Sequence, residues 1–201
     1  MNRSWLFGLV ILGLLQAYLS ADNGSVEWND TNPTQALLSD PIQKTVASKS
    51  ISHGDYTLQP QASFEITARV LSKTKYTFDR NADLVPVDLA LGWGPMSQHK
   101  VLDTLKIWQD HRWYFYRYEG SPVIPNDQMA KHSANMHLIP HNSKIESQIK
   151  AVKKGEVVHL TGYLVNVTGE NGFYWNSSLT REDTGDGSCE VVLVKTIEIL
   201  P

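Results

Sequence analysis

The clearest evidence for the architecture is in residues 143–167, which read SKIESQIKAVKKGEVVHLTGYLVNV. Ser143 and Glu146 have the Ser-x-x-Glu spacing of a helix capping box. Three apolar residues fall on one face of the helix that this box would start: Ile145, Ile149 and Val152. Gly155 is a natural stop for it. The sequence therefore predicts an amphipathic helix that begins at Ser143.

A strand is expected directly after this helix. Residues 157–167 are rich in Val and Leu, and Gly162 inside the run is typical of a bend or a bulge. Other apolar runs, several with alternating polar residues, predict strands at residues 63–78, 85–91, 107–118 and 190–199. Residues 169–172 predict a hairpin turn that leads into a short strand at 173–176.

This order of elements predicts a mainly β (α+β) fold. A helix between the third and fourth of five strands favours an OB-like five-stranded barrel. A sandwich built from the same elements is the alternative. The comparison depends on the order of the elements and on no sequence motif.

The N-terminal 21 residues indicate export. Arg3 is the one charged side chain among them, and the run that follows it is mostly apolar. This pattern is typical of a signal peptide or of an uncleaved membrane anchor. Residues 22–61 are interpreted as a polar linker or arm with a short helix near 34–38, and residues 62–201 as a single β-barrel-like domain. We therefore expect a bacterial protein that is periplasmic or anchored to the outer face of the cytoplasmic membrane.

The charge balance argues against binding to duplex nucleic acid. The chain has 18 Lys and Arg residues against 21 Asp and Glu residues, a net charge of −3, whereas duplex binding needs a basic face. Cys189 is the single cysteine, so no intrachain disulfide can form. Its position in a strand with Val191 and Leu193 predicts a buried, unreactive thiol. No cofactor or metal is expected.

Irregular polar segments supply the candidate ligand site. The predicted ligand-binding residues are Trp93, Arg112, Asn135, His137, Arg181 and Asp183. Amide and imidazole side chains can each donate or accept hydrogen bonds. An arginine offers a planar fork for a carboxylate or phosphate, and a nearby aspartate could orient it. We expect the ligand to be a small polar or anionic molecule or an envelope partner protein.

Trp93 lies between Gly92 and Gly94 and is the best candidate for an exposed ring, which would close one wall of this pocket. The alternative is that a tryptophan held by glycines anchors the loop. Residues 113–118, which read WYFYRY, are expected to carry aromatic rings on both faces of a strand. One face should join the core. The other is either covered or left open as a stacking platform for single strands or sugars.

A cell-envelope hydrolase is the alternative function. His137 could act with Cys189 as a nucleophile, or with a metal held by neighbouring histidines. The sequence lacks the His-Glu-x-x-His spacing of zinc proteases. A structural component of a membrane complex is a third interpretation, which would require an exposed apolar patch.

Overall fold

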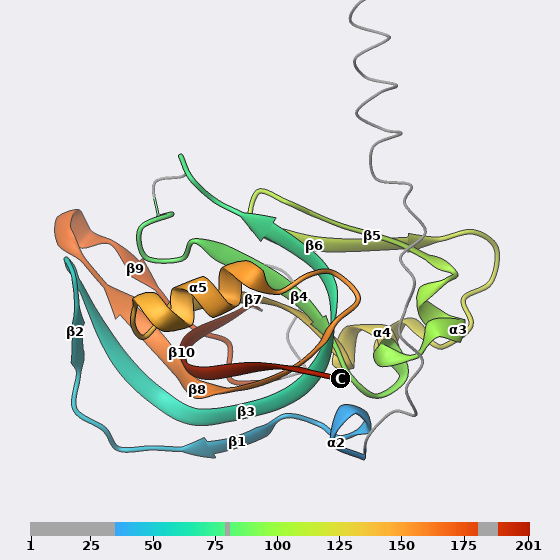
Figure 1. Ribbon diagram of the computed structural model, residues 1–201, viewed down its shortest axis with the longest axis horizontal. Coiled ribbons are helices and arrows are strands. Elements are labelled where there is room, and N and C mark those ends of the chain that lie inside the picture. The colour runs from blue at the N-terminus through green and yellow to red at the C-terminus, as the bar shows by residue number, and fades with distance from the viewer. Residues whose placement is uncertain (1–34, 79–80, 181–188) are drawn as a thin grey trace, which may run out of the picture.

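The computed structural model describes residues 35–78, 81–180 and 189–201 of the chain (Figure 1). Strands make up 50% of it and helices 19%, so the prediction of a mainly β fold is confirmed. The strands are β1 (Ile42–Thr45), β2 (Ile51–His53), β3 (Tyr56–Lys75), β4 (Val87–Gly92), β5 (Leu105–Asp110), β6 (Trp113–Tyr118), β7 (Ser133–Pro140), β8 (Val157–Thr168), β9 (Tyr174–Trp175) and β10 (Glu190–Leu200). The helices are α2 (Gln35–Leu38), η1 (Gly94–Ser97), α3 (His99–Leu102), α4 (Asn126–Lys131), α5 (Ser143–Ala151) and η2 (Glu170–Gly172).

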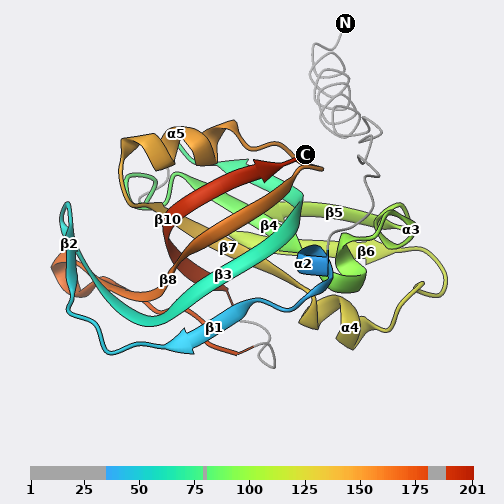
Figure 2. The same cartoon turned by 60° about the horizontal axis from the view of Figure 1, so that its bottom comes forward.

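Five strands of the large sheet pair in an order that returns to its starting strand. β3 pairs with β4, β4 with β7, β7 with β10, β10 with β8, and β8 again with β3. The β7–β10 pair is parallel and the other four pairs are antiparallel. The length of β3 allows it to pair with two different strands: residues 69–75 lie against β4, and residues 57–69 lie against β8. Figure 2 shows β3, β8 and β10 side by side beneath α5.

The main hydrophobic core contains side chains from these five strands and from α5. Ile145 and Ile149 on the apolar face of α5 belong to it. The helix is held at its C-terminal end by Lys73, whose Nζ donates to the carbonyl oxygens of Lys150 at 2.8 Å and Val152 at 2.5 Å. A cation at this position also suits the negative end of the helix.

Gly162 lies at the point where β8 pairs with β3 on one side and β10 on the other. A Cβ atom at this position would lie 2.1 Å from the carbonyl oxygen of Leu193. The pairing of β10 with β8 shifts register at the same place, between Val194 and Thr196. The irregularity expected near Gly162 is therefore confirmed, and it lies in β10 opposite the glycine, where the two backbones approach too closely for a Cβ atom.

The prediction of a single third strand at residues 107–118 is wrong. Residues 107–118 form an antiparallel hairpin, β5 and β6, that lies outside the large sheet. The chain reverses at His111 and Arg112, which both have positive φ (47° and 64°). The position of the third strand in the sheet belongs to β7, every residue of which is buried. The hairpin packs over the outer face of the sheet, where Leu71 and Ala90 join its side chains in a second cluster.

The start of α5 also differs from the prediction. Asn142 caps the helix, because its extended backbone places the side-chain oxygen 3.0 Å from the backbone nitrogen of Ile145, which donates to it. Ser143 is the first helical residue, and Glu146 pairs with Lys150 instead of completing a capping box. The short helix expected near 34–38 is confirmed as α2.

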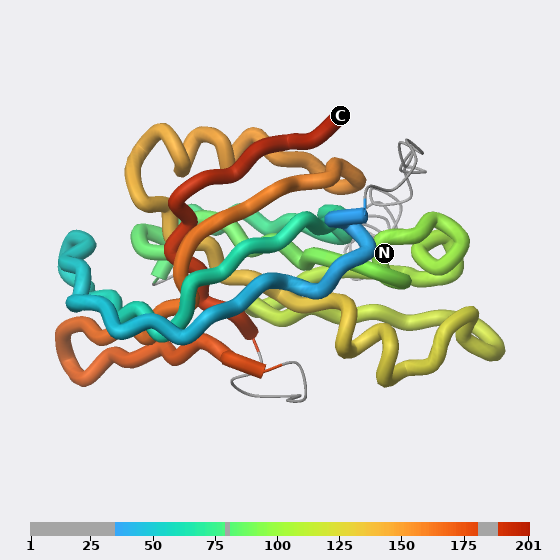
Figure 3. The backbone as a smooth tube through the Cα atoms, turned by 90° about the horizontal axis from the view of Figure 1, so that it is seen from below, coloured from blue at the N-terminus to red at the C-terminus, as the bar shows by residue number. Residues whose placement is uncertain are grey.

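The N-terminal part of the described chain joins the large sheet. β1 and β2, both in the segment interpreted as an arm, pair with β3, and Figure 3 shows β1, β3 and β8 running alongside one another. Across the described residues, the helices are too short or too polar to cross a bilayer. The expected signal peptide or anchor at residues 1–21 lies outside the described residues.

Candidate functional site

Asp88 is the centre of a buried polar cluster in the described structure. It lies in β4 between apolar neighbours, and its side chain is fully buried on the outer side of the sheet. The hydroxyl of Tyr76 donates to Asp88 Oδ2 at 3.1 Å. Arg112 donates to Asp88 Oδ1 at 3.3 Å, and His137 Nδ1 lies 3.0 Å from the same oxygen. A buried carboxylate needs such partners to offset its lost hydration.

Arg112 reaches this cluster from the turn of the β5–β6 hairpin. Its guanidinium also donates to the carbonyl of Val85 at 3.2 Å and lies over the ring of Tyr76, 3.9 Å from the centroid. The side chain is 13% exposed. Because the left-handed conformation of Arg112 is unfavourable for a residue with a Cβ atom, the contacts of its side chain help to hold the turn in place.

Asn135 fastens the same turn to β7. Its side-chain nitrogen donates to the carbonyl of Arg112 at 2.9 Å, and its side-chain oxygen accepts from Gln109 at 2.6 Å. Asn135 is 4% exposed. The amide therefore makes hydrogen bonds to two residues of the hairpin.

His137 lies between Asp88 and the indole ring of Trp175. The imidazole and indole centroids are 4.5 Å apart at an angle of 50°. His137 Nδ1 and Asp88 Oδ1 are close but are not aligned for a hydrogen bond. The indole of Trp175 also lies 5.5 Å from the Arg112 guanidinium and is half-buried. Trp175 thus covers the cluster on one side.

Electrostatics keep the Tyr76 phenol protonated. Burial raises its pKa, and the neighbouring Asp88 carboxylate raises it further, whereas Arg112 opposes the shift. A neutral phenol can donate to Asp88, whereas a phenolate would repel it. Tyr76 therefore acts as a fixed hydrogen-bond donor in this cluster.

The structure brings three of the six predicted site residues into one network: Arg112, Asn135 and His137. Their role in binding a ligand stays a prediction. Arg181 and Asp183 lie outside the described residues.

The expectation of an exposed Trp93 is wrong. Its side chain is fully buried in the main core, and its indole nitrogen donates to Asp40 at 3.1 Å. Its ring lies 6.4 Å from the ring of His132. Gly94 has a φ of +51°, and a Cβ atom there would lie 2.8 Å from the His132 ring. The glycine beside Trp93 thus permits close packing against His132, and the tryptophan anchors the loop.

Sequence reasoning missed Asp88, Tyr76 and Trp175. One signal was available, because Asp88 is the single charged residue in the otherwise apolar run of residues 85–91. A carboxylate in such a run is costly unless it is paired. No comparable signal marks Tyr76 or Trp175, which join the cluster from segments distant in the sequence.

The hydrolase alternative depends on Cys189 or on a metal bound near His137. Cys189 is half-buried, whereas the sequence predicts a buried thiol. Within residues 35–78, 81–180 and 189–201, no group of three or more His, Cys, Asp and Glu side chains is arranged to hold a metal ion.

Comparisons with protein-family models, with curated proteins and with solved structures found no match to this chain.

Proposed function

We propose that the protein is an exported or membrane-tethered binding module with an OB-type barrel, which recognises a small polar or anionic ligand. The strand pairings support the barrel. OB folds are five-stranded Greek-key barrels, and here β3, β4, β7, β8 and β10 pair in an order that returns to β3. α5 falls between the third and fourth of these strands in the sequence.

The position of the Asp88 cluster supports the ligand site. OB barrels bind ligands on the face of their second and third strands, between the loops that follow the first and the fourth. In this chain the second and third strands are β4 and β7, which carry Asp88 and His137. Tyr76 follows the first strand and Trp175 follows the fourth. The cluster therefore combines all four structural elements of an OB ligand site.

The chemistry of the cluster favours a polar ligand with a flat or sugar-like part. Trp175 offers part of an aromatic surface, and stacking on such a surface tolerates many ring systems. Imidazole and guanidinium groups next to it can donate hydrogen bonds to oxygen atoms of a ligand. The observation that carries the proposal is the convergence of His137, Arg112 and Tyr76 on buried Asp88 beneath Trp175. An envelope protein that inserts an acidic side chain at this point is the other occupant consistent with it.

The test is fluorine NMR on the full chain labelled with 5-fluorotryptophan. The Trp175 resonance is assigned by its loss in Trp175→Phe. Probes are inorganic phosphate, a dicarboxylate and uronic-acid disaccharides. We expect at least one of them to shift the Trp175 resonance while the resonance of buried Trp93 stays in place. If none of them moves Trp175 at millimolar concentration, the proposal of a small-ligand site is wrong.

A matched pair of variants then separates the site from its surroundings. For a probe that binds, Trp175→Ala should lower the affinity at least fivefold by calorimetry, because it removes the stacking surface, worth about 1–3 kcal/mol. Tyr174→Ala is the control, since Tyr174 is 74% exposed and adjacent in β9. Equal losses in both variants would contradict a site centred on Trp175.

The hydrolase alternative is supported by one observation. Buried Asp88 Oδ1 lies 3.0 Å from His137 Nδ1, and a carboxylate that accepts a hydrogen bond from this nitrogen orients the base in catalytic triads. Its test is reaction of the native chain with iodoacetamide at neutral pH. Labelling of Cys189 that slows at least tenfold in His137→Gln would support a Cys–His pair, and labelling independent of His137 would contradict it.

A further inference from the structure

The outer face of the β5–β6 hairpin combines aromatic and cationic side chains. Side chains alternate along each strand, so the inner face includes Ile107, Tyr114 and Tyr116, which pack against the body of the protein. The outer face carries Lys106, Trp108 and Asp110 of β5 and Trp113, Phe115 and Arg117 of β6.

An aromatic pair occupies the middle of this face. Trp108 and Phe115 are cross-strand partners, and their rings stack with centroids 5.4 Å apart at an angle of 17°. Phe115 is 39% exposed and Trp108 is half-buried. Each ring therefore covers one face of the other, and part of the aromatic surface stays open to solvent.

Two cations occupy the base of the hairpin. Lys106 and Arg117 are directly opposite each other in register, and both are exposed. Like charges in this position are destabilising. Neither side chain is within ion-pair distance of a carboxylate in the described part of the chain. The fold thus retains an unfavourable charge pair next to an exposed aromatic stack.

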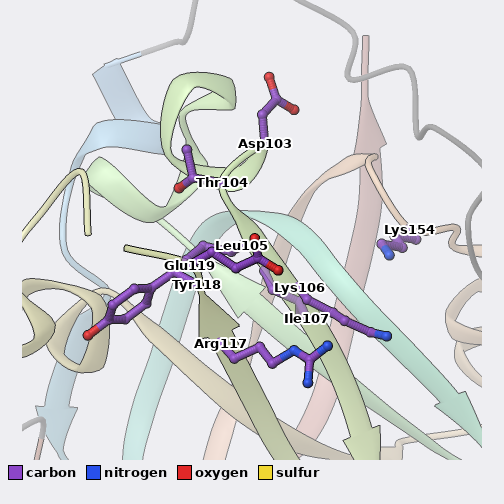
Figure 4. A pocket seen from close by; sticks show the side chains of 9 residues that line it. All are labelled: Asp103, Thr104, Leu105, Lys106, Ile107, Arg117, Tyr118, Glu119 and Lys154. Atoms are coloured by element: carbon purple, nitrogen blue, oxygen red, sulfur yellow. The ribbon is translucent and has the colours of Figure 1, made fainter. Parts of the chain in front are cut away.

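A cavity of about 520 Å³ lies beside these cations. Figure 4 shows Lys106 and Arg117 extending toward the side on which Lys154 lies, and all three line the cavity. Two acidic side chains, Asp103 and Glu119, line it as well. The lining of described residues thus has three cations and two carboxylates.

We propose that this face of the hairpin, consisting of Lys106, Trp108, Phe115 and Arg117, contacts the surface of an anionic phospholipid bilayer. Tryptophan is enriched at membrane interfaces, tryptophan and phenylalanine supply the apolar contacts of interfacial segments, and basic side chains beside them bind anionic headgroups. The inference rests on the membrane tether in the proposed function. The cavity beside Lys154 would then receive a phosphate group of the lipid.

The entry point of the chain agrees with this orientation. α2, where the described chain begins, packs against η1, and so does α3, which leads into β5. A tether that ends at residue 35 therefore enters the domain near the base of the hairpin. Residues 22–34 can span at most about 45 Å, which keeps this end of the domain near a membrane held by residues 1–21.

Single-stranded nucleic acid is the competing occupant, since it also prefers cations with aromatic rings. Bases stack on open ring faces, however, whereas one face of Trp108 and one face of Phe115 are already covered by the other ring. The face that each ring already covers favours the bilayer.

The test uses the full chain in lipid nanodiscs with an environment-sensitive fluorophore. In a Cys189→Ser background the fluorophore is attached at Glu119→Cys, beside the base of the hairpin, or at Ser52→Cys in β2, at the other end of the molecule (Figure 1). We expect the label at 119 to be quenched by spin-labelled lipid in discs that contain phosphatidylglycerol, and the label at 52 to be unaffected. Equal quenching at both sites, or none at 119, would overturn the inference.

Charge-removing variants test whether Lys106 and Arg117 contribute to the contact with lipid. Lys106→Gln with Arg117→Gln should lower the fraction of lipid-contacting label, with an equilibrium constant reduced roughly fivefold per cation. The control, Lys44→Gln with Lys49→Gln, removes two exposed cations elsewhere and should change nothing. Equal effects of the two pairs would contradict the assignment. Protection of the label at 119 by a single-stranded oligonucleotide, without quenching by lipid, would favour nucleic acid instead.

The failure of this inference can be distinguished from failure of the ligand site. If the chain stays outside the discs, the tether and the hairpin inference are both wrong, whereas the Trp175 resonance still reports on the ligand site. If the chain enters the discs but the label at 119 is not quenched, only the hairpin inference fails.

Discussion

Asp88→Asn is the most informative single substitution in the polar cluster. It removes one negative charge while keeping the shape of the side chain. The Asp88 carboxylate is fully buried, and it interacts with Arg112, Tyr76 and His137. Without the charge, the guanidinium of Arg112 keeps its position beside an amide that binds it less strongly. The free energy of unfolding should therefore decrease.

The structure sets the size of this decrease. Breaking a buried ion pair by removing one partner costs about 3–5 kcal/mol. Two features reduce the cost here: Arg112 is 13% exposed and also donates to the carbonyl of Val85. The asparagine oxygen can still accept a hydrogen bond from Tyr76. We expect a loss of about 2–3 kcal/mol.

Urea denaturation of a chain that begins at Asp22 measures this loss. With a denaturant dependence of about 2–3 kcal/mol per molar urea, the midpoint should fall by roughly 1 M. Asp55→Asn removes an exposed carboxylate and should change stability by less than about 0.5 kcal/mol. Arg112→Gln and the double variant complete a cycle whose coupling energy should exceed about 1 kcal/mol. A loss below about 0.5 kcal/mol for Asp88→Asn would refute a stabilising role for the ion pair.

Three further predictions concern the framework. Asn142→Ala should lower the free energy of unfolding by about 1 kcal/mol in urea denaturation, because Asn142 makes the capping hydrogen bond. Ser143→Ala should change it little. A larger loss for Ser143→Ala than for Asn142→Ala would contradict this cap. Burial lowers the pKa of Lys73 to about 8, so the unfolded chain holds more protons between pH 8 and 9.5. Stability should therefore rise with pH in that range, and Lys73→Met should flatten the slope. Gly162→Ala should lower the free energy of unfolding by more than about 3 kcal/mol or abolish folding, because its Cβ atom would collide with the Leu193 carbonyl. An unchanged melting temperature would show that β8 and β10 can move apart to accept the Cβ atom.

The strands of the large sheet could be predicted where one local rule was sufficient. β3, β4, β8 and β10 are continuous apolar or alternating runs, and the predicted ranges overlap them. β7 was missed because it contains polar residues and is nevertheless buried on both faces. Its outer face is covered by the β5–β6 hairpin, a tertiary contact that the sequence of β7 does not encode.

The hairpin itself was missed for a different reason. Two-residue turns with positive φ are usually made by glycine or asparagine, and here they are made by His111 and Arg112. Nothing in the local sequence indicates a reversal at this point. The turn is held by distant partners instead, because Asn135 binds the carbonyl of Arg112 and Asp88 binds its guanidinium.

The candidate site could likewise be predicted only in part from the sequence. Asn135 and His137 were identified from the chemistry of their side chains, and their placement two residues apart in an extended strand puts both on the outer face. The residue that connects them to Arg112 is Asp88, and only the pairing of β4 with β7 places it opposite His137. Sequence patterns gave the donors and acceptors, whereas the sheet topology determined which of them meet.

The β5–β6 hairpin takes part in both proposals, and its dimensions make them separable. Its turn places Arg112 in the Asp88 cluster, whereas Lys106 and Arg117 lie at its base. Five residues of extended strand separate the turn from the base, a distance of about 17 Å. This exceeds the Debye length of about 8 Å at physiological ionic strength, so removing the two basal charges should leave the Arg112–Asp88 pair intact. The charge variants at the base should therefore change lipid contact without changing the Trp175 resonance, and Asp88→Asn should change the resonance without abolishing lipid contact.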